Sequence, residues 1–191
     1  MSKVEQPVLF FATPAELEAW MGEHGEESDG IWLKFAKQAS GIQSIVYAEA
    51  VEIALCHGWI DGQAKPLDDH HYLQRFTPRR ARSKWSKRNR EKAERLSAEG
   101  RMRPPGLREI DRAKEDGRWD NAYDSPATAT VPDDFQAALD AEPAAREFFE
   151  SLSSTKRYSF LYRITDAKRP ETRAKRIAEY VELLREGKTL T

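Results

Sequence analysis

The residues best suited to chemistry lie in one block, residues 56–89, which reads CHGWIDGQAKPLDDHHYLQRFTPRRARSKWSKRN. It combines two tryptophans, an aspartate next to a glycine, two adjacent histidines and a dense run of Arg and Lys. Core packing alone rarely calls for this mixture, and polar and aromatic residues gathered on loops and strand ends usually mark a site. We therefore expect ligand-binding residues here, and the candidates are Trp59, Asp61, Arg75, Arg79, Arg80, Ser83, Trp85, Ser86 and Asn89.

The arginines of this block favour an anionic ligand. The guanidinium groups of Arg75, Arg79 and Arg80 suit phosphate or carboxylate oxygens in bidentate geometry. Ser83 or Ser86 can cap the next helix, whose N-terminus would add free N–H groups and the positive end of a dipole. We predict an Arg-rich pocket for a phosphate-bearing or carboxylate-bearing ligand. The alternative is a solvated basic helix face with the neighbouring tryptophan in the core, which is the commoner use of a charge run.

Trp59 and Asp61 should point to the same side of a strand, because side chains alternate along it. An Asp beside a Trp could bind a ligand donor. It could also act as a general acid or base while Arg75 or Arg79 steadies an oxyanion. The alternative is that Asp61 pairs with one of these arginines across a hairpin and fixes the geometry of the sheet. No residue pattern selects a reaction, so the sequence favours a non-enzymatic binding protein over an enzyme of unknown reaction.

The metal and nucleophile motifs are weaker. His70 and His71 are adjacent and would point to opposite sides of a strand, and the single Cys56 has no second cysteine to share a metal. Ser153 and Lys156 match S-x-x-K, but the partner motifs of that enzyme class are absent and helix capping already explains the serine. We expect no metal and no cofactor.

Charge is banded along a chain of 191 residues whose net charge is only −1. Residues 1–30 and 111–150 are acidic, whereas residues 75–103 and the segment from Lys156 onward are basic. Such banding can build a positive patch or can pair internally between segments. The basic segment suggests nucleic-acid binding as a further but weaker hypothesis, for which affinity would fall steeply with salt. The expected partner is a small anionic ligand or a protein, and the oligomeric state is open.

The apolar runs are only a few residues long, and the N-terminus has no hydrophobic region of signal-peptide length. We expect no membrane insertion and a cytoplasmic location.

Hydrophobic periodicity and turn residues predict an α+β fold, with a small antiparallel β-sheet flanked by helices and a C-terminal helical segment. Residues 1–117 would form the α+β domain, 118–132 a linker, and 133–191 a helical region packed on the first domain. The expected strands are residues 30–37, 42–45, 59–64 and 72–77. The expected helices begin at Pro14, Tyr47, Ser83 or Ser86, Pro104, Asp133, Pro143, Ser153 and Pro170.

Several long motifs resemble the YdeI/OmpD-associated (bacteriocin-protection) family. They are AVE at 50–52 with ALCHGWIDG at 54–62, YLQRFTPRR at 72–80, SKWS at 83–86 with Asn89, and AKRPETR at 167–173 with Arg176 and Ile177. The resemblance extends from about residue 32 to 187. It implies a role in resistance to cationic antimicrobial peptides or bacteriocins, and association with an outer-membrane porin. It carries over no catalytic residue. Peptide capture by the acidic N-terminal segment is one way to serve such a role.

Overall fold

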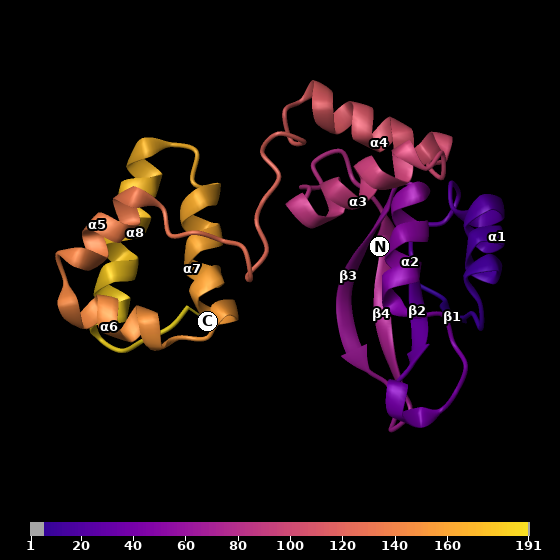
Figure 1. Cartoon of the computed structure of the whole chain (residues 1–191), viewed down its shortest axis with the longest axis horizontal. Helices are drawn as coiled ribbons and strands as arrows, with labels where there is room; N and C mark the ends of the chain where they lie inside the picture. The colour runs from indigo at the N-terminus through magenta and orange to yellow at the C-terminus, as the bar shows by residue number, and fades with distance from the viewer. Residues whose placement is uncertain (1–5, 191) are drawn as a thin grey trace, which may run out of the picture. The chain divides into compact units, whose positions relative to one another are not determined.

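The computed structural model describes residues 6–190, which divide into two compact units (Figure 1). The N-terminal unit contains the residues up to Trp85 together with Asn89–Ala122, and the C-terminal unit contains Ser86–Arg88 and the residues from Tyr123 onward. Each unit has its own hydrophobic core. Trp119 and Ala122, which we placed in a linker, are buried in the N-terminal core. Packing of the helical region on the first domain stays a prediction.

The N-terminal unit is built on a four-stranded sheet of order β1-β2-β4-β3. The strands are β1 (Val8–Phe10), β2 (Ile31–Ala36), β3 (Trp59–Pro66) and β4 (His71–Pro78). β4 pairs antiparallel with β3, as the sequence predicts, and also with β2, whereas β1 is parallel to β2. The prediction of a strand at residues 42–45 is wrong. Both edges of β2 are occupied, by β1 and β4, so residues 42–45 cannot pair with β2 to form the expected hairpin.

In the first part of the chain, the first helix begins and the second helix ends at residues whose local chemistry favours it. Thr13 caps the first helix by accepting a hydrogen bond from the Glu16 backbone N–H at 3.4 Å. Gly58 follows the second helix with a φ of +76°, and a side chain there would meet the Pro105 carbonyl oxygen. The helices are α1 (Pro14–His24), α2 (Tyr47–Cys56), α3 (Lys87–Ala98) and α4 (Pro104–Glu115).

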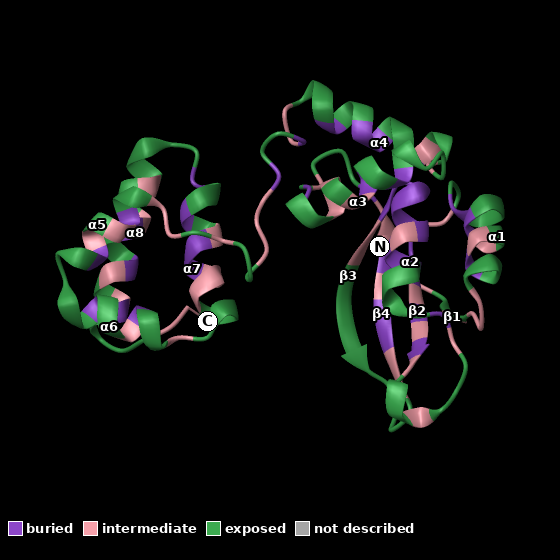
Figure 2. Ribbon diagram, viewed as in Figure 1, coloured by how far each residue is buried: buried purple, intermediate pink, exposed green. Residues whose placement is uncertain are grey.

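The two faces of the sheet differ in burial. Along β2, Ile31, Leu33 and Phe35 are buried, whereas Trp32 and Lys34 between them remain partly exposed (Figure 2). The buried side chains belong to the core that also contains residues of α1 and α2. The sheet therefore has one core face and one face that stays accessible, as is common for antiparallel sheets.

The C-terminal unit is helical, as predicted. Its core joins Phe135, Phe149, Phe160 and Tyr180 through successive edge-to-face ring contacts. Ser153 caps the third helix by accepting from the Lys156 backbone N–H at 3.4 Å. The helices are α5 (Asp133–Asp140), α6 (Pro143–Ser151), α7 (Ser154–Asp166) and α8 (Pro170–Arg185). The α+β class expected from the sequence is confirmed.

Candidate functional site

Both tryptophans of the predicted pocket are core residues. Trp59 is 1% exposed, and its indole N–H donates to the Gly25 carbonyl oxygen at 3.0 Å. Trp85 is equally buried, with its ring 4.8 Å from that of Trp119. The Arg79 guanidinium stacks 3.6 Å from the centre of the Trp85 ring and is itself buried. Trp85 is therefore a core residue, as in the alternative to a ligand-binding role. Its stack with Arg79 stabilises the loop that follows β4.

Asp61 and Arg75 lie on opposite faces of the sheet. Asp61 is in register with Phe76 on the core face, whereas Arg75 is in register with Trp32 on the accessible face. The Asp61 carboxylate accepts a hydrogen bond from the Tyr47 hydroxyl at 2.6 Å. The Arg75 Nε–H donates to the Gln6 side-chain oxygen at 2.7 Å. Asp61 and Arg75 therefore do not share a pocket, and they do not form an ion pair with each other.

The remaining predicted residues follow β4. Arg80 is exposed, and its backbone N–H donates to the Ser83 hydroxyl at 2.9 Å, which closes a short turn. Ser86 and Asn89 are partly buried, and α3 begins between them at Lys87. The structure therefore leaves Arg80 as the most accessible of the predicted arginines at this end of the sheet.

Much of the basic segment 75–103 is neutralised internally. Lys92, Arg95 and Arg101 all reach the Glu52 carboxylate of α2, with Lys92 at 3.8 Å and Arg101 at 3.3 Å. Arg103 pairs with Glu18 at 2.7 Å. Burial alone would raise the pKa of Glu18, but hydrogen bonds from Arg103 and His57 outweigh it and hold that pKa below its usual range. Internal charge complementarity thus accounts for much of the banding in this part of the chain.

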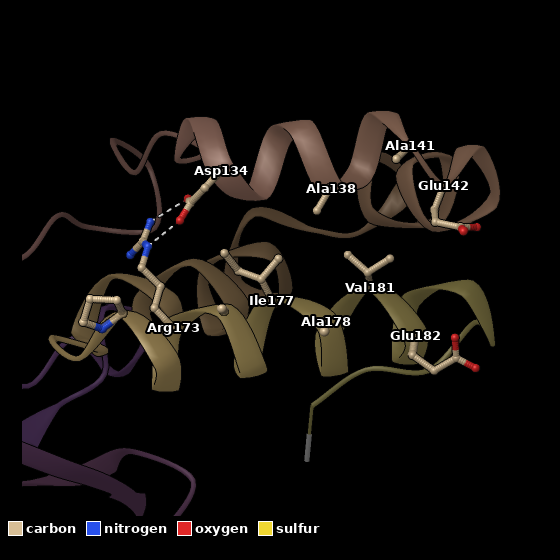
Figure 3. A pocket seen from close by; sticks show the side chains of 11 residues that line it. Asp134, Ala138, Ala141, Glu142, Arg173, Ile177, Ala178, Val181 and Glu182 are labelled. Carbon is tan, nitrogen blue, oxygen red and sulfur yellow. Dashed lines mark hydrogen bonds and ion pairs between the residues drawn. The ribbon is translucent and has the colours of Figure 1, made fainter.

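A groove that sequence reasoning missed runs along the C-terminal unit between α5 and α8 (Figure 3). Its volume is about 560 Å³. Apolar side chains lie along its middle, an Asp134–Arg173 pair lies at one end, and Glu142 and Glu182 lie at the other. The lining residues are Asp134, Ala138, Ala141, Glu142, Pro170, Arg173, Ala174, Ile177, Ala178, Val181 and Glu182.

The groove is open because small residues face each other across it. Ala174 and Ala178 lie four residues apart on one face of α8, and Ala138 lies on α5. The methyl groups of these three lining residues fill little of the space between the helices. That spacing was readable in the sequence. It gives no signal by itself, however, until the fold sets the two helices side by side.

Carboxylates dominate the charge of the groove. Its lining has three of them, Asp134, Glu142 and Glu182, against the one guanidinium of Arg173, a net charge of −2. Arg173 donates two hydrogen bonds to Asp134, at 2.5 and 2.7 Å, and holds the pKa of that carboxyl below its usual range. Hydrogen bonds from Arg185 likewise lower the pKa of Glu182. Both groups are therefore ionised at neutral pH.

The weaker sequence motifs show no catalytic arrangement. Burial raises the pKa of the Cys56 thiol to about 11, which leaves almost no thiolate at neutral pH. The His71 ring meets the Asp68 carboxylate at 2.9 Å at the tip of the β3–β4 hairpin. Residues 6–190 contain no group of three metal-ligating side chains. Over the same residues, no helix has the length and hydropathy needed to cross a bilayer.

The fold is thus an α+β sheet unit followed by a helical unit with an acidic-ended apolar groove. Residues 9–109 match a family model described as "Domain of unknown function (DUF8412)", and the chain belongs to that family. Residues 128–187 match a second model, described as "Bacteriocin-protection, YdeI or OmpD-Associated". The resemblance seen in the sequence is thereby confirmed for the helical unit, and the motifs between residues 50 and 89 lie within the first model. No curated protein and no solved structure shows significant similarity to the chain.

Proposed function

We propose that the protein is a non-enzymatic binding protein of the bacteriocin-protection type, and that its α5–α8 groove binds a short cationic amphipathic helix. One observation carries the proposal: an apolar groove with a net charge of −2 lies wholly within the segment that matches the bacteriocin-protection model. Apolar grooves between helices commonly receive the apolar face of a partner helix. Asp134 is paired with Arg173 and Glu182 with Arg185, but Glu142 forms no ion pair within residues 6–190 and favours a partner with positive charge. Antimicrobial peptides with Lys and Arg on one face have this chemistry.

The dimensions of the groove suit a short helix. Arg173 and Glu182 mark its ends on α8, and at about 1.5 Å per residue they lie about 14 Å apart. A peptide helix of two to three turns covers that length, with apolar anchors at positions i, i+3 or i+4, and i+7 over Ile177 and Val181. Lys or Arg residues at one end of the peptide would then reach Glu142 and Glu182.

A titration with a fluorescein-labelled Leu/Lys amphipathic peptide of about 14 residues tests this proposal. Anisotropy of the label reports binding to the full chain at low salt. Ala178→Trp fills the groove and should weaken binding at least about tenfold, a loss of about 1.4 kcal/mol. The matched control is Ala137→Trp, an exposed position of α5 outside the groove, which should change the affinity by less than about twofold. Binding that survives Ala178→Trp unchanged would place the peptide elsewhere.

The anionic ligand expected from the sequence remains a second candidate, supported by a separate observation. Beside the loop of residues 79–85, the indole N–H of Trp85 and one terminal nitrogen of Arg118 are buried without a hydrogen-bond acceptor in the described part of the chain. Buried donors without acceptors are costly, and an anion would satisfy them. We propose a small phosphate or carboxylate here, with Arg80 at the entrance. Inorganic phosphate should raise the melting temperature, and Arg80→Ala should reduce that rise. No rise with phosphate, acetate or a nucleotide would contradict it.

A further inference from the structure

Among the described residues, the strand positions on the accessible face of the sheet carry aromatic and basic side chains and no carboxylate; Asp68, in the hairpin tip, pairs with His71. Strand registers place Val8, Trp32 and Arg75 in one row across β1, β2 and β4. The next row runs Phe10, Lys34, Leu73, Lys65 across all four strands, because a bulge between Asp61 and Ala64 resets β3. We call this surface the open sheet face; its residues are Val8, Phe10, Trp32, Lys34, Ala36, Ile60, Lys65, His71, Leu73, Arg75 and Thr77.

Two lysines of the open sheet face lie over its aromatic rings. The Lys65 ammonium is 4.2 Å from the centre of the Trp32 ring, and the Lys34 ammonium is 5.8 Å from that of Phe10. Lys65 on β3 reaches Trp32 on β2 across the intervening strand β4. Its aliphatic stem therefore lies over Leu73, which explains why Leu73 is only 3% exposed on this face. Phe10 remains 43% exposed.

Three cations of the open sheet face, Lys34, Lys65 and Arg75, lack acidic partners of the kind that neutralise α3, within the residues that the structure describes. Within residues 6–190, Lys34 and Lys65 form no ion pair, and Arg75 uses only its Nε–H, toward the neutral Gln6 side chain. Three positive charges on one face without a carboxylate attract a polyanion. The same charge disfavours the cationic peptide proposed for the groove. Flat aromatic rings among those charges favour a polyanion that also carries rings.

We propose that the open sheet face binds single-stranded nucleic acid. Bases stack on Trp32 and Phe10, and Lys34, Lys65 and Arg75 contact the phosphates, with each lysine moving from its ring to the backbone as a base takes its place. Four-stranded sheets that present aromatic side chains bind RNA in this way, stacking two or three bases. The site lies in the N-terminal unit and is independent of the peptide groove. A paired duplex keeps its bases stacked on one another, so only unpaired strands can use these rings.

Binding is measured by anisotropy of fluorescein-labelled oligo-dT and oligo-U, each of about 12 nucleotides, added to the full chain. The slope of log affinity against log salt should be about −2, since three phosphate contacts on a single strand each contribute about −0.7. A triple variant, Lys34→Gln/Lys65→Gln/Arg75→Gln, should weaken binding at least about thirtyfold. The charge-matched control removes three exposed arginines that lie outside the sheet and outside the proposed phosphate site, Arg82→Gln/Arg88→Gln/Arg169→Gln, and should change binding less than about threefold.

Stacking is tested apart from charge. Trp32→Leu retains an apolar side chain and should weaken binding about tenfold, within the range of a lost base–aromatic stack. An abasic oligonucleotide of equal length should bind more weakly than oligo-dT and be insensitive to Trp32→Leu. The proposal is overturned if no oligonucleotide binds at low salt, if the control triple variant loses more affinity than the sheet triple variant, or if the abasic strand binds as tightly as oligo-dT. Equal binding of oligo-dT and oligo-U supports stacking without sugar recognition.

Discussion

The α5–α8 groove and the open sheet face are accessible surfaces of opposite character. The groove is lined by small aliphatic side chains and by charged residues that sum to −2. The sheet face presents Trp32 and Phe10 beside Lys34 and Lys65, which have no acidic partner within residues 6–190. A cationic amphipathic helix fits the first, and a single-stranded polyanion fits the second. We propose that the charge left uncompensated after folding selects the partner of each surface.

The helix α3 shows why charge density along the chain misleads. It lies in the most basic segment of the sequence, yet Lys92 and Arg95 are paired with Glu52 on α2. Lys34 and Lys65 stand in less basic stretches but remain unpaired within the described residues. Lys34 and Lys65 are therefore unpaired cations of the N-terminal unit that the charge pattern of the sequence did not identify.

The largest expected effect distinguishes Trp85, which stabilises the fold, from Trp32, which we propose binds nucleic acid. Trp85→Ala removes a fully buried ring that stacks on Arg79, and should lower the free energy of unfolding by about 3–5 kcal/mol. Trp32→Leu on the accessible face should cost less than about 1 kcal/mol. Urea denaturation followed by circular dichroism measures both. A cost for Trp32→Leu as large as that for Trp85→Ala would make Trp32 a core residue and remove the contrast between the two surfaces.

Reversing the charge of the groove should give the next largest effect. Glu142→Lys/Glu182→Lys changes the net charge of the lining from −2 to +2 and should weaken the cationic peptide about tenfold or more at low salt. Binding of oligo-dT should change less than about threefold. Glu147→Lys/Glu150→Lys, at exposed positions of α6 outside the groove, is the control for total charge, because it adds the same four charges. If it weakens the peptide as much as the double reversal, the attraction is diffuse and the groove has no special role.

The smallest expected effect concerns the ion pair at the end of the groove. Arg173 depresses the pKa of Asp134, so the pair adds stability above the ordinary carboxyl pKa of about 4, and this stability is lost as the pH falls through the folded-state pKa. Asp134→Asn should lower the melting temperature by about 2–4 °C at pH 7. The deficit should vanish near pH 2. Asp133→Asn is the neighbouring control, and a deficit that persists at low pH would mean that charge is not its cause.

Local signals predicted much of the fold, because caps and periodicity act over a few residues. The Ser153 cap and the hairpin formed by β3 and β4 are as expected. The parallel strand β1 was missed, since three residues carry no period and a parallel partner is distant in the chain. Its position explains why the segment 42–45 is not a strand.

The site was harder to predict than the fold, because it depends on which face of the sheet becomes the core. Alternation correctly puts Trp59 and Asp61 on one side, but only the packing of α1 and α2 makes that side the buried one. Arg75 then falls on the opposite face. The groove could not be foreseen, because Ala138 and Ala178 meet only after α5 and α8 are assembled.

The most direct test of the account is an NMR titration of the ¹⁵N-labelled full chain with the cationic Leu/Lys peptide. The account predicts that shift changes gather on the backbone amides of α5 and α8 around Ala138, Ile177 and Val181, and that Ala178→Trp abolishes them. Changes confined to the acidic N-terminal segment, or none at a peptide concentration that saturates the anisotropy signal, would contradict it.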